Sequence, residues 1–156
     1  MRRAFLLAAA TLSLGACSSE PPAKPYLPPI ELAKLAGGAG GSMASCPTEK
    51  CLTVYVAPWC GYCRAGTPTM IALRAFLKTK NVATRFVVGM APLEDVKEYA
   101  KEFGPEALLD PDNAMGVRGG VPHFFVSDAT GRVLKRVPGL PQTGDVELLA
   151  AYFGLP

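Results

Sequence analysis

Cys60 and Cys63, in the pattern Trp-Cys-Gly-Tyr-Cys, are the residues whose types and spacing are best suited to chemistry. They follow a β-branched run at 53–56 and open a segment predicted to be helical over 61–80. A thiol at a helix N-terminus faces unpaired N–H groups and the positive end of the helix dipole, and both stabilise the thiolate. Spacing i, i+3 places both thiols on one helical face. The pattern therefore predicts thiol–disulfide exchange, in which Cys63 resolves a mixed disulfide formed by Cys60.

Two other interpretations of this cysteine pair are half of a zinc site and an inert structural pair. A zinc site usually brings a second cysteine pair or a Cys/His set at defined spacing. The single histidine is His123, and the other local pair, Cys46 and Cys51, has the wrong spacing for a zinc knuckle. We therefore expect redox chemistry and no metal.

The N-terminus resembles an export signal. Arg2 and Arg3 form a positive segment, and residues 4–14 are apolar or small. This apolar stretch is too short to span a bilayer, which needs about 20 residues. Residues 1–16 are therefore predicted to be a signal peptide for general secretion. The two arginines also suggest a twin-arginine signal, although the segment before the apolar stretch is very short for one.

The quartet Leu-Gly-Ala-Cys ending at Cys17 resembles a bacterial lipobox, in which the cysteine is lipidated and becomes the first mature residue. The alternative is an ordinary signal peptide with a cysteine near the cleavage site. The residue after the lipidated cysteine is Ser18 rather than Asp, which resembles the pattern of lipoproteins that are sorted to the outer membrane. We expect a lipid anchor in the bacterial cell envelope, facing the periplasm and on the outer membrane, where the four remaining cysteines can form disulfides.

Two parts are predicted for the mature chain. Residues 17–45 are rich in Pro and Gly and are expected to form a lipidated tether, with a short helix at 30–36. Residues 46–156 have the size and apolar content of one domain.

Within that domain, strands and helices alternate along the sequence. The expected strands are 53–57, 83–89, 123–127 and 132–137; the expected helices are 61–80, 93–103 and a last one capped by Thr143 and ending near 153, with turns at 110–113 and 128–131. The first strand–helix–strand unit implies parallel strands with a right-handed crossover.

Over residues 53–153 the chain resembles the thioredoxin superfamily. Besides the Cys-Gly-Tyr-Cys motif, Pro68 matches the family's kinking proline and Pro122 matches the proline of its cis-proline loop. The resemblance implies an α/β thioredoxin fold: a parallel βαβ unit followed by a ββα hairpin unit, with a central mixed sheet flanked by helices. The Gly-Tyr dipeptide is found in periplasmic disulfide isomerases, and tethered relatives also include cytochrome-maturation reductases.

The resemblance also implies roles for residues around the cysteines. Val121, before the cis Pro122, would offer its backbone to a substrate chain. Trp59 either covers one side of the disulfide or is a packing residue. Tyr62 is either a docking contact beside the exposed thiol of Cys60 or a surface aromatic, and Gly61 is expected to lie with them at the substrate-binding surface. His123 either meets substrate, tunes Cys60 or is a structural strand residue.

Two features depart from the family pattern, one residue and the length of one segment. Val54 stands where reductases of the family often carry a buried acid, so it cannot relay a proton from Cys63. The tether is too short to form the dimerisation domain of the disulfide isomerases, which favours a monomer.

Cys46 and Cys51 have two interpretations. They form a structural disulfide before the first strand, which we favour, or a second redox couple that relays electrons to Cys60 and Cys63.

The sequence thus predicts an exported, membrane-tethered thiol–disulfide oxidoreductase that needs no cofactor. Its expected partners are disulfide-containing envelope proteins and a membrane or periplasmic electron donor. The sequence contains no run of basic residues, so we expect no nucleic-acid partner. A disulfide-donating oxidase and a non-catalytic tethered binding module are the alternatives.

Overall fold

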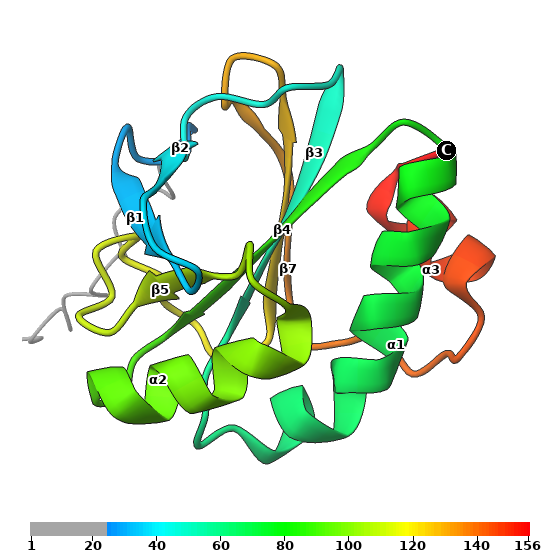
Figure 1. Cartoon of the computed structure of the whole chain (residues 1–156). Coiled ribbons are helices and arrows are strands. Elements are labelled where there is room, and N and C mark those ends of the chain that lie inside the picture. Colours follow the sequence, from blue (N-terminus) through cyan, green and yellow to red (C-terminus); the bar gives the residue numbers. More distant parts are fainter. Residues whose placement is uncertain (1–24) are drawn as a thin grey trace, which may run out of the picture.

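The computed structural model of the chain describes residues 25–156. Their core is a seven-stranded mixed sheet in the order β2-β1-β5-β4-β3-β6-β7. The strands are β1 (Glu31–Lys34), β2 (Ala39–Ser42), β3 (Lys50–Val56), β4 (Ala83–Gly89), β5 (Leu108–Asp110), β6 (His123–Asp128) and β7 (Val133–Pro138). The helices are α1 (Gly61–Thr79), α2 (Leu93–Ala100), a 3-10 turn at Lys101–Phe103, and α3 (Val146–Phe153). Figure 1 shows α1 and α3 side by side on one side of the sheet and β1 and β2 away from them.

The central strands form the expected α/β arrangement. β3 runs parallel to β4 and antiparallel to β6, and β4 runs parallel to β5. β3 and β4 are nearly continuous apolar runs because both faces of the sheet are covered there. The βαβ unit, the β6–β7 hairpin and the last helix follow in the order that the thioredoxin resemblance implies.

Alternation along β3 separates two apolar clusters on opposite faces of the sheet. Val54 and Val56 point into a cluster shared with all three helices, whereas Tyr55 points into a second cluster. Leu27 and Met43 close this second cluster and are 2% and 0% exposed. The second face is therefore covered by the N-terminal segment and by loops rather than by helices.

This covering corrects the predicted tether. Residues 30–36 form no helix: β1 pairs with β5 and with β2, which extends the sheet to its edge. An isolated bridge joins Tyr26 to Arg132. The folded domain therefore includes residues between 26 and 45, which the prediction had assigned to the tether. The signal peptide at 1–16, Cys17 and residues 18–24 lie outside the described residues.

Other differences are smaller. The expected helix 93–103 is split into α2 and the 3-10 turn, and the segment before the 110–113 turn forms the unpredicted strand β5. Asp145, not Thr143, caps α3: its carboxylate accepts from the N–H groups of Glu147 and Leu148. Pro68 lies inside α1 as expected. Within residues 25–156, no helix combines the length and the apolar character needed to cross a bilayer.

Candidate redox site

The redox pair lies where β3 ends and α1 begins. Cys60 is the N-cap residue of α1, with φ −83° and ψ 107°, and its Sγ accepts a hydrogen bond of 3.1 Å from the Cys63 N–H. One turn into the helix, Cys63 forms a disulfide with Cys60 across a Cα–Cα distance of 5.2 Å. The cap position, which is usually taken by Ser, Thr, Asp or Asn, is thus held by a sulfur atom that faces the free N–H groups of the helix.

The two sulfur-bearing residues are both nearly covered. Cys63 has no exposed surface, and Cys60 is 5% exposed, which is less than we expected for the attacking residue. Trp59 and Tyr62 are 63% and 80% exposed beside them. The inner and outer positions of the pair therefore differ only slightly in exposure in the disulfide form, while two aromatic side chains stand out from the surface around it.

The loop before β6 approaches Cys60 from the other side of the site. The Val121–Pro122 peptide bond is cis, and the Val121 carbonyl oxygen lies 3.3 Å from Cys60 Sγ. Gly119 and Gly120 reach this turn with φ values of +83° and +98°, which side-chain-bearing residues rarely adopt. The loop that the resemblance singled out is therefore next to the disulfide, and Val121 and Cys60 are in contact.

Trp59 is held by a residue that sequence reasoning missed. Its indole Nε1–H donates to the Met90 carbonyl oxygen at 2.7 Å, and Met90 has a φ of +57° just after β4. Arg64 supports the same turn, because its Nε–H donates to the Pro58 carbonyl oxygen at 2.7 Å. The Trp59–Met90 contact joins segments 31 residues apart that meet only in the folded chain, whereas the Arg64–Pro58 contact is local.

Beneath Cys63 there is a chain of hydroxyl groups. Thr67 donates to the Cys63 carbonyl oxygen at 3.0 Å, and its hydroxyl lies 2.9 Å from the buried hydroxyl of Tyr99. Burial raises the pKa of Tyr99, so this phenol stays protonated at neutral pH. Val54 is buried in the helix-side cluster.

Among residues 25–156, the buried carboxylate is that of Asp110, which lies with the second apolar cluster on the other face of the sheet. Asp110 is 1% exposed and accepts from the Tyr55 hydroxyl at 3.1 Å and from the N–H groups of Ala114 and Met115. Burial and the neighbouring Asp110 carboxylate raise the pKa of Tyr55. This pair anchors the loop after β5.

His123 also faces away from α1. It pairs with Tyr55 across the β3–β6 ladder and stacks on Phe125 with ring centroids 4.5 Å apart. Its Nδ1 lies 3.3 Å from the Gly120 carbonyl oxygen, and its buried Nε2 has no protein partner. Burial, assisted by the positive charge of Arg136, lowers the pKa of His123. Of the three interpretations of this histidine, the structural strand residue fits its position best.

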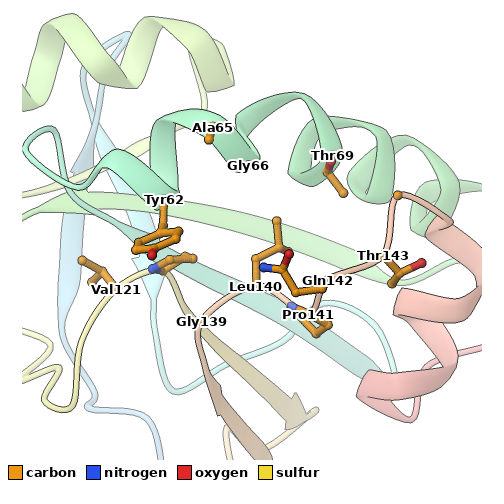
Figure 2. Close-up of a pocket in the computed structure, with 12 residues that line it drawn as sticks. Tyr62, Ala65, Gly66, Thr69, Val121, Gly139, Leu140, Pro141, Gln142 and Thr143 are labelled. Carbon is orange, nitrogen blue, oxygen red and sulfur yellow. The ribbon is translucent and has the colours of Figure 1, made fainter.

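A pocket of about 560 Å³ adjoins the cysteine pair. It lies between α1 and the segment that leads from β7 to α3, and Tyr62, Val121 and Pro122 belong to its wall. Figure 2 shows Tyr62 and Val121 at one end of this pocket and Thr143 at the other. Its remaining wall residues, among them Leu140 and Gln142, were not among the predicted site residues.

The second cysteine pair is also a disulfide. Cys46 and Cys51 are joined across a Cα–Cα distance of 5.8 Å, and Cys51 is fully buried at the start of β3. Between them, the Thr48 hydroxyl donates to the Lys50 carbonyl oxygen at 2.6 Å and accepts from the Ala83 N–H at 3.1 Å. The closed loop thus ties the starts of β3 and β4 together, at the end of the sheet opposite Cys60. Residues 25–156 hold no group of three or more His, Cys, Asp and Glu side chains placed to bind a metal ion.

Comparison with known proteins supports the fold. No protein-family model matches the chain. Over 101 residues the chain is 35% identical to the thiol:disulfide interchange protein HelX of Rhodobacter capsulatus. The match covers 61% of this chain and 54% of HelX, so the chain spans about half the length of that curated relative.

Two solved structures illustrate the shared architecture. A structure assigned as the thiol:disulfide interchange protein DsbE of Chlorobium tepidum is 25% identical and superposes with a TM-score of 0.64, over 81% of this chain and 91% of that one. The exposed lipoprotein thioredoxin Etrx1 of Streptococcus pneumoniae is 21% identical, with a TM-score of 0.62 over 80% and 97% of the two chains. The chain has the thioredoxin fold.

Proposed function

We propose that this chain is a thiol–disulfide oxidoreductase that uses the Cys60–Cys63 pair on disulfides of other proteins. The observation that carries the proposal is the position of Cys60: its sulfur caps α1 at 3.1 Å from the Cys63 N–H and lies 3.3 Å from the carbonyl oxygen before cis Pro122. The helix N-terminus would stabilise a Cys60 thiolate, and the loop at Val121 would present backbone to a substrate chain. The names of HelX and DsbE support the same chemistry.

In the reductive direction, the Cys60 thiolate attacks one sulfur of a substrate disulfide. A Cys60–substrate S–S bond forms, and the other substrate sulfur leaves as a thiolate that takes up a proton. The Cys63 thiol then gives up its proton to water and attacks Cys60, so that the Cys60–Cys63 disulfide forms and the second substrate sulfur leaves. Two electrons pass from the protein dithiol to the substrate, and an upstream dithiol protein must restore them.

Electron flow in the opposite sense would make the chain a disulfide donor. The same atoms serve both directions, and the reduction potentials of the pair and its partners decide between them. Alkylation of acid-quenched cells distinguishes the two: we expect Cys60 and Cys63 to be trapped mainly as thiols, and a mainly oxidised pair would favour the donor.

The roles of the two cysteines can be tested by trapping. The Cys63→Ala variant lacks the resolving thiol, so it should accumulate mixed disulfides on Cys60, visible on non-reducing gels and lost on reduction. The Cys60→Ala variant is the matched control and should accumulate none, because the remaining thiol is buried. Equal trapping by both variants would contradict the assigned roles of the two cysteines. A wild-type protein that does not reduce insulin would contradict the proposed oxidoreductase activity.

We further propose that the domain is exported and held on the envelope membrane by a lipid on Cys17, acting as a monomer. The lipobox-like quartet before Cys17 and the apolar stretch at 4–14 support this location. The lipoprotein thioredoxin Etrx1 provides a precedent for an anchored domain of this fold. Disulfide-containing envelope proteins and a membrane or periplasmic electron donor would be its partners.

A further inference from the structure

We propose that the chain has a second binding site, which takes a small organic anion through the guanidinium groups of Arg74 and Arg85. The site is a pocket beside the first half of β4, and the Cys46–Cys51 disulfide forms part of its wall. The charged group of the ligand is a carboxylate or a phosphate. This inference does not depend on the proposed oxidoreductase function, because the pocket and the redox pair lie at opposite ends of β3.

The pocket exists because one strand of the sheet is short. β5 pairs with residues 87–89 of β4, so the earlier residues 83–86 have a strand neighbour on the β3 side alone. On the other side of these residues lies a pocket of about 590 Å³, which we call the β4-edge pocket. Its far wall is formed by the β1–β2 hairpin and the segment before β5. A volume of this size suits a small molecule.

Contacts inside the protein hold the walls of the β4-edge pocket in place. The Arg85 guanidinium donates three hydrogen bonds of 2.9 to 3.2 Å to backbone carbonyl oxygens in the segment 42–45. On the hairpin, Gly40 approaches Leu108 so closely that an added Cβ would lie 2.2 Å from Leu108 Cδ2. The Arg85 side chain is therefore fixed in position, and the pocket that it lines is preformed.

The β4-edge pocket has an excess of positive charge. Its charged lining residues are Lys34, Arg74, Arg85 and Glu106, three cations and one acid. The acid is already paired, because Glu106 lies 2.8 Å from the Lys34 ammonium. Among the described residues, no carboxylate forms an ion pair with either arginine. Two guanidinium charges thus line the same pocket, and both have only neutral partners.

Both guanidinium groups are partly withdrawn from water. Burial lowers the pKa of Arg85. Arg74 lies over the Phe86 ring, 5.1 Å from its centroid, and its Nη1 donates to the Phe103 carbonyl oxygen at 2.6 Å. An anion beside a partly buried cation favours its charged form and replaces interactions that water no longer supplies. Carboxylate and phosphate oxygens match the planar set of N–H groups that arginine presents.

The test titrates the intact protein, with both disulfides formed, with three probes at constant ionic strength. The probes are succinate, inorganic phosphate and succinamide, the neutral analogue of succinate. Binding is followed by NMR shifts of the backbone amides of Arg85, Phe86 and Leu108. We expect succinate to saturate these shifts and to bind about tenfold or more tightly than succinamide, because hydrogen bonds between charged groups are stronger than those to neutral ones. The tighter of succinate and phosphate identifies the charged group.

A matched pair of variants locates the anion. Arg74→Gln removes one guanidinium that does not hold the segment 42–45, and it should weaken succinate binding about tenfold. Arg132→Gln removes the same charge from an exposed position outside the pocket and should keep the wild-type affinity.

The disulfide in the pocket wall gives a second measurement. Cys46 lines the pocket and is the partly exposed residue of its pair, since Cys51 is fully buried. Bound succinate should therefore slow the reduction of Cys46–Cys51 by dithiothreitol in proportion to the fraction of pocket occupied. The rate for the Cys60–Cys63 disulfide, at the opposite end of β3, should stay unchanged.

Affinities that agree within about twofold for succinate, phosphate and succinamide, or equal losses in Arg74→Gln and Arg132→Gln, would overturn the inference. An unchanged rate of Cys46–Cys51 reduction at saturating succinate would overturn it as well, because the anion would then lie elsewhere. Each of these results leaves the oxidoreductase function standing.

Discussion

Cys60 shows how much of the site a local sequence pattern can predict. Its place at a helix N-terminus follows from the apolar run before it and the helical segment after it, so the capping contact with the Cys63 N–H was predictable. The surroundings of Trp59 were not, because the Met90 carbonyl that holds the indole comes from another strand. Similarly, the cis bond at Pro122 was implied by resemblance, whereas the contact of Val121 with Cys60 could be found only in the fold.

His123 gives a pH-dependent prediction at the scale of one residue. Its pKa is lowered, chiefly by burial, so the folded chain prefers the neutral ring, whereas the unfolded chain binds a proton below about pH 6.5. Its contribution to stability is therefore complete above that pH and is lost as the pH falls through the unfolded pKa towards the folded one. The free energy of unfolding should decrease between pH 7.5 and 5.

The measurement is denaturant unfolding at these two pH values for the wild type and for His123→Phe, which keeps an aromatic ring stacked on Phe125. The variant should show a smaller decrease, since this is the one histidine of the chain. An NMR titration that places the imidazole pKa above 6.5, or an unchanged decrease in the variant, would contradict the prediction.

At the scale of secondary-structure elements, the long, strongly patterned segments were predictable and the short ones were not. β4 matches its predicted bounds, and α1, β3, β6 and β7 differ by a few residues. β5 has three residues and runs into an Asp-Pro turn, and β2 reads Ala-Gly-Gly-Ser, a composition more typical of a flexible linker. These strands exist because neighbouring strands supply their hydrogen bonds, which the local sequence does not record.

The Cys46–Cys51 disulfide makes a prediction at this scale. Replacing both cysteines by Ser should lower the free energy of unfolding by about 2 kcal/mol, the loop-entropy value for so short a ring. Turnover should hardly change, because the ring ties the start of β3 to β4 through Thr48 and lies at the opposite end of that strand from Cys60. Unfolding in denaturant and turnover with the physiological reductant are measured on the same preparation.

A loss of turnover of about tenfold or more, in a double variant whose circular dichroism is unchanged, would instead make this pair an electron relay. Such a loss corresponds to about 1.4 kcal/mol of activation free energy, which a distant structural ring would not supply.

At the scale of the whole molecule, the predicted boundary at residue 46 failed because composition was taken as a measure of disorder. Pro- and Gly-rich sequence is typical of linkers, yet a few apolar side chains within it are enough to cover one face of a sheet. Leu27, Leu32 and Met43 do this here, each with 6% or less of its surface exposed. No local period marks them, since Leu32 lies in a short strand, Met43 in a turn and Leu27 in irregular backbone.

The anchor is tested on the intact protein in cells. Cys17→Ser should move the mature protein from the membrane fraction to the soluble fraction while insulin reduction by the extract is unchanged, because Cys17 is remote in sequence from the redox pair. A control substitution at Ser19 should leave the protein in the membrane fraction. Recovery of the wild-type mature protein entirely in the soluble fraction would contradict lipidation.

The attachment of the N-terminal segment to the β6–β7 hairpin would determine which end of the domain faces a bilayer in which Cys17 is anchored. Leu27 donates to the Gly131 carbonyl, and Pro25 accepts from the Val133 N–H, at the end of β6 far from the cis proline. Cys17 and Pro25 are eight residue steps apart, a distance of at most roughly 28 Å for a fully extended chain. The end of the domain that carries the β6–β7 turn would face the lipid headgroups. Trp59 would then lie far from the bilayer, so brominated lipids should not quench its fluorescence. In such an anchored molecule the redox site would face away from the membrane. It would act on soluble proteins of the surrounding compartment and would not reach disulfides close to the surface of its own membrane.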